Sequence, residues 1–502
     1  MRRGGVFAVS NDLTRRRLLG GAAGIAGVLA LGACGRSGGA AVAPTSEAVR
    51  RAEAARQAAG ARLVTARLAP RPVTLDLGGP TVDTWAYGDS LPGPLLRGRA
   101  GDRLRVDLSN NLPADTTVHW HGVALRNDMD GVPDVTQAKI TPGGAFRYEF
   151  TVPDPGTYFY HPHVGVQLDR GLYGVLVVDD PDEPGRYDAE WILVLDDWVD
   201  GTGRTPDQVL ESLARSGTAM GGMDGMGGMG GMGSMTSPLL GGAGDVSYPY
   251  YLANGRVPSA PLTFTGRPGQ RVRLRIVNAG SDTAFRVAVG GHRLTVTHTD
   301  GFAVQPQQTD ALLIAMGERF DVELTLGDGV FPLVAAAEGK SGLARALVRT
   351  SAGRVPSPSI RPAELGRQVL LANDLRAADA VRLAPKPVDR TLDLVLGGSM
   401  GSYEWTINGK TFPDTKPLPV EQGERLRLRF SNQSMMFHPM HVHGHTFGIT
   451  DGGARKDTII VRSMQSLAVE LDANNPGQWA SHCHNVYHAE RGMMVNLSYR
   501  HT

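Results

Sequence analysis

Histidine residues spaced two apart are the most chemically informative feature of this sequence. Four pairs share this spacing: His119/His121, His161/His163, His441/His443 and His482/His484, the third extended by His445. A chain of 502 residues with 14 histidines would hold only about 0.4 such pairs by chance. Residues i and i+2 of a β-strand point to the same face, so each pair aims two imidazoles in one direction. Because imidazole binds Zn, Cu, Fe and Ni, the sequence predicts a site for several metal ions.

Cys483 stands between two of these histidines and narrows the choice of metal. On an extended segment its sulfur faces away from the imidazoles of His482 and His484. His488 and Met493 follow shortly after it, and His438 precedes the third pair. Thiolate, two imidazoles and a weak thioether are the ligands of a blue-copper electron-transfer site, whereas structural zinc prefers a closed tetrahedral set. These four residues therefore predict a blue-copper centre.

Three segments, 101–110, 269–278 and 423–432, share one alternation of polar and apolar residues. A period of two is typical of a half-buried β-strand, and the segments lie a domain's length apart. A His-x-His pair follows the first and third segments in the same register, whereas the middle domain has none. The sequence thus predicts three related β domains, with a pseudo-twofold arrangement of the outer two that brings all eight imidazoles together.

Proline-rich stretches at 180–185 and 356–362 separate these repeats and mark domain boundaries. We predict this organisation, in chain order: an export signal over 1–33, a tether over 34–67 with one helix after Ser46, a first β domain over 68–185, a second over 186–352 with a Met-rich loop at 220–235, a linker over 353–366 and a third β domain over 367–502. The 51 basic and 50 acidic residues nearly cancel, which argues against a nucleic-acid partner. With two cysteines, a disulfide framework is excluded.

The N-terminus looks like an export signal. Three arginines at 15–17 precede an uncharged run, Leu18 to Ala33, that is too short for a transmembrane helix. This pattern resembles a twin-arginine signal, and its end, Leu31-Gly32-Ala33-Cys34, resembles a bacterial lipoprotein cleavage site. We expect export to the periplasmic side of the cell envelope, with membrane contact only through a lipid anchor at Cys34. A plain signal followed by an incidental cysteine is the alternative.

Taken together, four motifs resemble the signatures of three-domain multicopper oxidases: His119-Trp-His-Gly, His161-Pro-His, His438-Pro-Met-His-Val-His-Gly-His and His482-Cys-His-Asn-Val-Tyr-His-Ala-Glu-Arg-Gly-Met. The resemblance covers residues 68–502 and implies an all-β chain of three cupredoxin-like domains, each a Greek-key sandwich or barrel. It also implies four copper ions. Their ligands would be His438, Cys483, His488 and Met493 for type 1, His119 and His441 for type 2, and His121, His161, His163, His443, His482 and His484 for the type 3 pair.

The same resemblance implies the roles of other residues. Electrons would pass singly from substrate through Cys483 to its flanking histidines, and four of them would reduce O₂ to two waters. Asp130 takes the place of a carboxylate that donates or relays protons in similar enzymes, with capping of its turn as the alternative role. The second carboxylate of such enzymes is replaced by Ala489, with Glu490 next. Four histidines have no ligand role in this pattern and are interpreted as structural: His292, His298, His445 and His501.

The positions of the methionines favour Cu(I) as the substrate. Six of them, one at every third position, occupy the Gly-rich loop 220–235, which cannot pack a core. Thioethers favour Cu(I), so the loop is interpreted as a copper-collecting arm, with a low-complexity linker as the alternative. Met435 and Met436 stand beside the predicted type 1 ligands, and Met436 matches a methionine at the substrate copper site of similar cuprous oxidases. Met400 and Glu404 are candidates to complete that site, although Ser434 stands where those relatives have Asp.

We therefore predict an O₂-reducing multicopper oxidase whose favoured substrate is Cu(I) and whose role is copper tolerance. A laccase-like oxidase of small phenols or other aromatic reductants, with the same copper core, is the first alternative. Two alternatives come from another class: an exported protein that only sequesters copper, and a cell-envelope scaffold without activity. The complete ligand set argues against both, because neither storage nor scaffolding needs an electron path.

Overall fold

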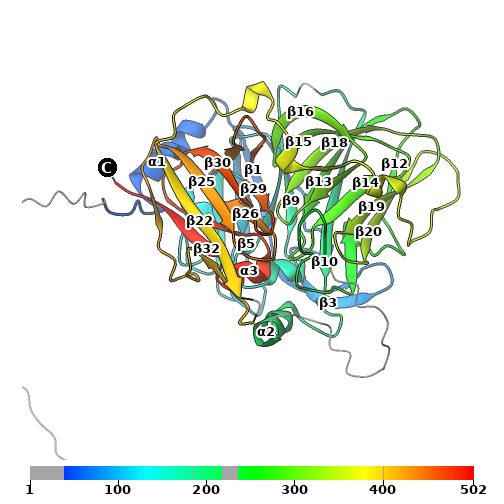
Figure 1. Ribbon diagram of the computed structural model, residues 1–502, viewed down its shortest axis with the longest axis horizontal. Coiled ribbons are helices and arrows are strands. Elements are labelled where there is room, and N and C mark those ends of the chain that lie inside the picture. The colour runs from blue at the N-terminus through cyan, green and yellow to red at the C-terminus, as the bar shows by residue number, and fades with distance from the viewer. Residues whose placement is uncertain (1–38, 184, 217–235, 400, 502) are drawn as a thin grey trace, which may run out of the picture. The chain divides into compact units, whose positions relative to one another are not determined.

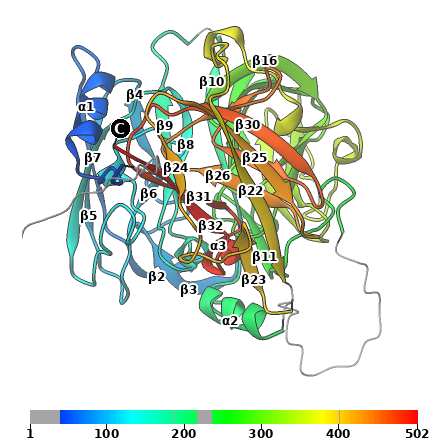
Figure 2. The same ribbon diagram turned by 60° about the vertical axis from the view of Figure 1, so that its left-hand side comes forward.

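The computed structural model describes residues 39–183, 185–216, 236–399 and 401–501. Cys34, Met400 and the Met-rich loop 220–235 lie outside these residues. Strands predominate in the described part, and none of its helices has the length and apolar character needed to cross a membrane (Figures 1 and 2). The helices are α1 (Glu47–Arg56), α2 (Pro206–Ser216) and α3 (Val486–Glu490), with 3₁₀ turns η1 (Asn127–Met129), η2 (Gln167–Arg170), η3 (Ala363–Gly366), η4 (Ala372–Asp374) and η5 (Asp379–Val381).

The strands before residue 180, blue and cyan in Figure 1, pair in the orders β1-β5-β7, β2-β3 and β4-β9-β8-β6. Their bounds are β1 (Leu63–Leu68), β2 (Arg71–Asp76), β3 (Thr81–Ala86), β4 (Leu96–Arg99), β5 (Arg103–Ser109), β6 (His119–His121), β7 (Ala145–Thr151), β8 (Gly156–His161) and β9 (Gly174–Asp179). Strand β6 is short and wholly buried, and it carries the first histidine pair.

The middle strands pair in the orders β11-β10-β13-β18-β15-β16 and β12-β20-β19-β14-β17-β21. Their bounds are β10 (Ala189–Trp198), β11 (Tyr250–Ala253), β12 (Thr263–Thr265), β13 (Arg271–Asn278), β14 (Phe285–Val289), β15 (Leu294–Thr299), β16 (Phe302–Thr309), β17 (Ala311–Ile314), β18 (Arg319–Thr325), β19 (Val330–Ala337), β20 (Leu343–Arg349) and β21 (Val369–Leu371). Strand β21 lies beyond residue 366, where we expected the third domain to begin, yet it pairs with β17 and extends a middle sheet.

The last strands, yellow to red in Figure 1, pair in the orders β23-β22-β25-β30-β27-β28 and β24-β32-β31-β26-β29. Their bounds are β22 (Arg390–Ser399), β23 (Glu404–Ile407), β24 (Leu418–Val420), β25 (Arg425–Asn432), β26 (His438–Val442), β27 (Phe447–Ile449), β28 (Arg455–Lys456), β29 (Thr458–Val461), β30 (Ser466–Asp472), β31 (Gln478–Cys483) and β32 (Met494–Tyr499). Together with the sheets before it, this arrangement confirms the predicted all-β fold.

The three sequence repeats occupy the same place in their sheets. Strands β5, β13 and β25 each lie between a parallel partner and an antiparallel partner: β1 and β7, β10 and β18, β22 and β30. Along β5, Leu104, Val106 and Leu108 are buried while the residues between them are more exposed, as the period of two predicts. The repeat of sequence is therefore also a repeat of structure.

The segment expected to be a tether packs against the fold instead. Helix α1 follows Ser46, as predicted, and buries Val49 and Glu53. The Glu53 carboxylate accepts hydrogen bonds from the backbone N–H and the hydroxyl of Thr151, at 2.6 and 2.7 Å. Val42 adds a backbone bond to Tyr499 in the last strand. An isolated helix of this length is marginal in water, so its contacts with β7 stabilise it.

Adjacent strands place the histidine pairs opposite one another within each outer domain. In the first, β6 pairs antiparallel with β8, and His119 lies opposite His161. In the third, β26 pairs antiparallel with β31, and His441 lies opposite His482. The two outer domains also contact each other directly, since the Asn127 side chain exchanges hydrogen bonds with the backbone of Gln478. These pairings set the positions of the imidazoles.

A buried ion pair joins the middle domain to the third. The guanidinium of Arg319, which begins β18, donates two hydrogen bonds to the Asp457 carboxylate at 2.7 and 2.6 Å, and both side chains are fully buried. Lys456 continues this buried network through its ammonium contacts with Asp300 and Glu318. Removing one partner of a buried pair leaves a charge without compensation, which is strongly destabilising.

We predict that Arg319→Met lowers the free energy of unfolding of the metal-free protein by about 3 kcal/mol, because Asp457 would keep its charge without its main partner. Urea denaturation followed by tryptophan fluorescence measures this loss. Arg429→Met is the matched control: its ion pair with Asp393 is exposed, 57% and 53%, so its loss should stay below about 1 kcal/mol. Equal losses of unfolding free energy in the two variants would show that the buried ion pair stabilises the fold no more than the exposed one.

Candidate metal centres

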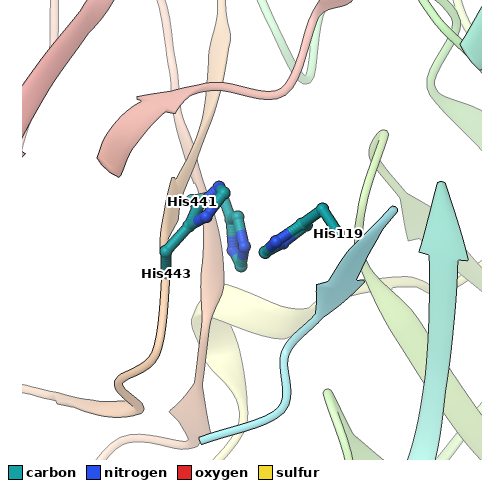
Figure 3. A group of neighbouring side chains, drawn as sticks. All are labelled: His119, His441 and His443. Carbon is teal, nitrogen blue, oxygen red and sulfur yellow. The ribbon is translucent and has the colours of Figure 1, made fainter. Parts of the chain in front are cut away.

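The histidine pairs of the two outer domains converge on one buried site. The ring of His119 stacks on that of His443 with centroids 3.8 Å apart, and His121 stacks on His441 at 3.7 Å. Figure 3 shows His119, on the strand from the first domain, facing His441 and His443 from the third. Groups of three ligand atoms that lie within 4.8 Å of one another include His119/His441/His443, His119/His121/His161 and His163/His443/His482. The structure thus brings together all eight histidines of the four motif pairs.

Burial favours the neutral form of six of these imidazoles. Loss of water around the ring is the largest cause, and it lowers the pKa of His482 to about 3. The pKa is also lowered by burial, with neighbouring histidines adding to the effect, at five other rings: His121, His161, His163, His443 and His484. A neutral imidazole carries one N–H and one nitrogen with a free lone pair. The position of each N–H therefore decides which nitrogen can bind a metal.

Backbone carbonyls place the N–H on Nδ1 of four rings. A carbonyl oxygen only accepts hydrogen bonds, so an Nδ1 within reach of one must donate. The four contacts, of 2.8–2.9 Å, are His119 with Asp130 O, His161 with Pro162 O, His441 with Asp457 O, and His482 with Cys483 O. Their Nε2 atoms consequently carry lone pairs.

The ring nitrogens without a proton either face one another or have no hydrogen-bond partner. Nε2 of His443 lies 3.0 Å from Nε2 of His482, and Nδ1 of His443 already donates to the Asp130 carboxylate. Nε2 of His119, Nε2 of His441 and Nδ1 of His121 are buried without a hydrogen-bond partner in the part of the chain that the structure describes. Facing lone pairs repel unless a cation lies between them. The donor set therefore fits the copper ions that the sequence predicts.

A second group of ligand atoms surrounds Cys483. Its sulfur lies 3.6 Å from Nδ1 of His438 and 3.6 Å from Nδ1 of His488, and the two Nδ1 atoms are 3.1 Å apart. Met493 is fully buried beside them, and its backbone bonds to Cys483 and His488. Burial raises the pKa of the Cys483 thiol, so a bound cation is needed to hold the thiolate. This arrangement matches the blue-copper ligand set.

Polar side chains orient the two histidines of this group. Nε2 of His488 donates to the Asp245 carboxylate at 2.8 Å, and Nε2 of His438 is 2.8 Å from the Ser434 hydroxyl. Tyr403 donates a further hydrogen bond to Asp245. With Nε2 occupied, Nδ1 of each ring is left for the metal. Sequence reasoning missed Asp245, because it follows a Gly-rich stretch of the middle domain and nothing near it signals a contact with the third domain.

Two buried carboxylates flank the larger site. Asp130 accepts from Nδ1 of His443 at 2.9 Å and lies 3.2 Å from Nδ1 of His119, so it links histidines of both outer domains. Asp457 accepts from Nε2 of His121 at 3.1 Å and was missed from the sequence. The sequence feature that could have indicated Asp457 is a charged pair, Lys456-Asp457, directly before the buried strand β29.

The cavity beside this site contains a third carboxyl group. Its lining includes four of the motif histidines, with Ala489 and Glu490: His161, His163, His482 and His484. Glu490 is exposed at the edge of this cavity, where its carboxyl group is open to solvent. Glu490 thus reaches the cavity although it stands one residue after the position that similar enzymes use.

The remaining predicted residues lie outside the two groups of ligand atoms. Met436 is half-buried beneath the segment at Gly242, where an added Cβ would lie 3.2 Å from its sulfur. Glu404 is exposed at the start of β23, 3.4 Å from the Ser402 hydroxyl, and Met400 lies outside the described residues. His445 bonds to Tyr499 and to the backbone of His443, and burial lowers its pKa to about 4.

Comparisons with known proteins agree with this geometry. Profiles of the multicopper oxidase family match residues 72–183, 189–353 and 385–501. Multicopper oxidase MmcO of Mycobacterium tuberculosis is 52% identical, over 97% of this chain and 96% of that protein. A copper resistance protein A homologue of Pseudomonas syringae pv. tomato is 29% identical, over 80% and 87%. The crystal structure of a multicopper oxidase from Pseudomonas thermotolerans is 28% identical and superposes with a TM-score of 0.67, covering 88% of this chain and all of that one.

The cofactor and the reaction class follow from these matches together. Copper is the cofactor, as four ions of types 1, 2 and 3, and O₂ is the electron acceptor of the enzyme. The three matched segments follow one another along the chain and take in all four histidine motifs. The chain belongs to the multicopper oxidase family.

Proposed function

We propose that the substrate of this multicopper oxidase is Cu(I), which it oxidises to Cu(II) in the service of copper tolerance. The proposal rests on the burial of the smaller site, the group of ligand atoms around Cys483. His438 and His488 are fully buried, and their outer nitrogens are capped by Ser434, 8% exposed, and Asp245, 6% exposed. A flat phenol finds no open imidazole edge there, whereas an ion held by thioethers outside the buried site needs no such edge. The name of the copper resistance relatives agrees with this role.

The ligand assignments are part of the proposal. His438, Cys483, His488 and Met493 would hold type 1 copper, and the remaining motif histidines would hold the other three ions as the resemblance implies. When bound, these ions would accept electrons singly and deliver four of them to O₂. The backbone of Cys483 joins its sulfur at one site to the imidazoles of His482 and His484 at the other. Asp130 and Glu490 would hold and pass on the protons that O₂ reduction consumes.

A laccase-like activity on phenols is the second candidate. It would use the same ligands and differ only in what contacts the covered site. Copper sequestration without turnover is less well supported, because the buried Cys483 connects two metal groups and a storage protein has no use for that connection. Oxygen consumption with Cu(I) and with a phenol, before and after deletion of residues 220–235, separates the three. Sequestration predicts no oxygen consumption with either reductant.

We also propose that the twin-arginine signal exports the protein to the cell envelope and that Cys34 is acylated there. Residues 1–38 lie outside the described part of the chain, so the proposal rests on the sequence pattern. Incorporation of radiolabelled palmitate by the parent, and its loss in Cys34→Ala, would support acylation. Equal labelling of both would refute it.

Met436→Ala should lower kcat/KM for Cu(I) by about tenfold and leave phenol oxidation unchanged, because one thioether contact for the substrate ion is lost. Oxygen uptake with each reductant provides the measurement. Val64→Ala is the control, since this apolar side chain is also half-buried but lies in β1, away from both groups of ligand atoms. Parallel loss of both activities in Met436→Ala would argue against a dedicated cuprous site.

Cys483→Ser should abolish the blue absorption band and turnover with both reductants, because the thiolate is removed from between the two groups. Visible spectra and oxygen uptake test this. Ser481→Ala on the same strand is the control and should keep both properties, since its buried hydroxyl has no hydrogen-bond partner among the described residues. Turnover that survives in Cys483→Ser would refute the electron path.

A further inference from the structure

Two methionines on the surface of the third domain are exposed to an unusual degree. Met435 is 71% exposed and Met464 is 63% exposed. No other large apolar side chain of the described residues is more than half exposed. Burial of apolar surface therefore does not explain why methionine occupies these positions.

The two residues lie on neighbouring loops, one before β26 and the other between β29 and β30. The backbone N–H of Met464 donates to the carbonyl of Ser434 at 3.3 Å, and the Ser463 hydroxyl donates to the same carbonyl at 3.1 Å. Ser434 directly precedes Met435 in the chain. The two methionine backbones are consequently held side by side.

Backbone preference does not account for Met464 either. Its φ is +56°, in the left-handed region that favours Gly, Asn or Asp. A residue that adopts this conformation although no packing of its side chain offsets the conformational cost is typical of a functional position. What the side chain offers there is its thioether, a soft ligand that prefers Cu(I).

Ser434 connects this surface to the buried type 1 ligands. Its hydroxyl lies 2.8 Å from Nε2 of His438, while its carbonyl accepts the hydrogen bond from Met464. The path from the exposed methionines to His438 thus runs through one residue. Met436, next in the chain, lies beneath the segment at Gly242 and is less accessible.

We propose that the sulfur atoms of Met435 and Met464 form a surface site that receives the Cu(I) substrate. This inference rests on the proposed function and names residues distinct from Met436, Met400 and Glu404. The bound ion gives one electron toward His438 by way of Ser434 and becomes Cu(II), which thioethers hold less well, so the product leaves. Four such events balance one O₂: four Cu(I), one O₂ and four protons yield four Cu(II) and two waters.

The double variant Met435→Leu/Met464→Leu tests the site, because leucine keeps the apolar surface but has no sulfur. In the copper-loaded enzyme we expect the KM for Cu(I) to rise about tenfold with kcat nearly unchanged. Leu95→Ala, at another exposed apolar side chain, is the control and should match the parent. An unchanged KM in the double variant, with Cu(I) oxidation intact, would overturn the inference and leave the proposed function standing.

A binding measurement separates the two proposals. Ag(I) is a soft monovalent cation that the enzyme cannot oxidise, and methionines that bind it resist conversion to the sulfoxide by peroxide. Mass spectrometry of the copper-loaded protein should show that Ag(I) protects Met435 and Met464. Oxidation of both residues at the same rate with and without Ag(I) would contradict the site. Protection in a protein that does not oxidise Cu(I) would instead refute the proposed function alone.

Discussion

Imidazole lone pairs that face one another without a proton between them are the constraint on which this structure depends. Nδ1 of His482 donates to a backbone carbonyl and Nδ1 of His443 donates to Asp130. Their Nε2 atoms are 3.0 Å apart, and because neither carries a proton, no hydrogen bond can form between them. Burial keeps both rings neutral, and protonation cannot relieve the repulsion. A cation satisfies both nitrogens at once. Both of these rings belong to the third domain, but Nε2 of His163 from the first domain lies 3.3 Å from Nε2 of His482, so the site is complete only when the two domains meet.

The middle domain contributes no histidine pair but stabilises this meeting. Arg319 neutralises Asp457, which in turn fixes His121 from the first domain and His441 from the third. Asp245, also from the middle domain, orients His488 at the smaller site. Charges from one domain thus position ligands that belong to the other two. The middle domain holds no histidine pair, yet it packs against both sites because its charged side chains orient their ligands.

The sequence predicted the features that follow from periodicity. Alternation along a strand placed Cys483 opposite His482 and His484, and the three repeats predicted related sheets in which β5, β13 and β25 are equivalent. Residues that act through packing between distant segments left no such pattern, as Arg319 and Asp245 show. The helix after Ser46 was predicted, but its attachment to Thr151 was not, because the contact depends on a strand about 100 residues away.

We expect ligands from both ends of the chain to share the same ions. Anomalous diffraction from crystals of the copper-loaded protein, recorded on either side of the copper absorption edge, tests it most directly. We expect one group of copper peaks between the histidines of the first and third domains and a separate peak beside Cys483. Peaks bound by the histidines of one domain alone, or the absence of copper signal between the two domains, would contradict it.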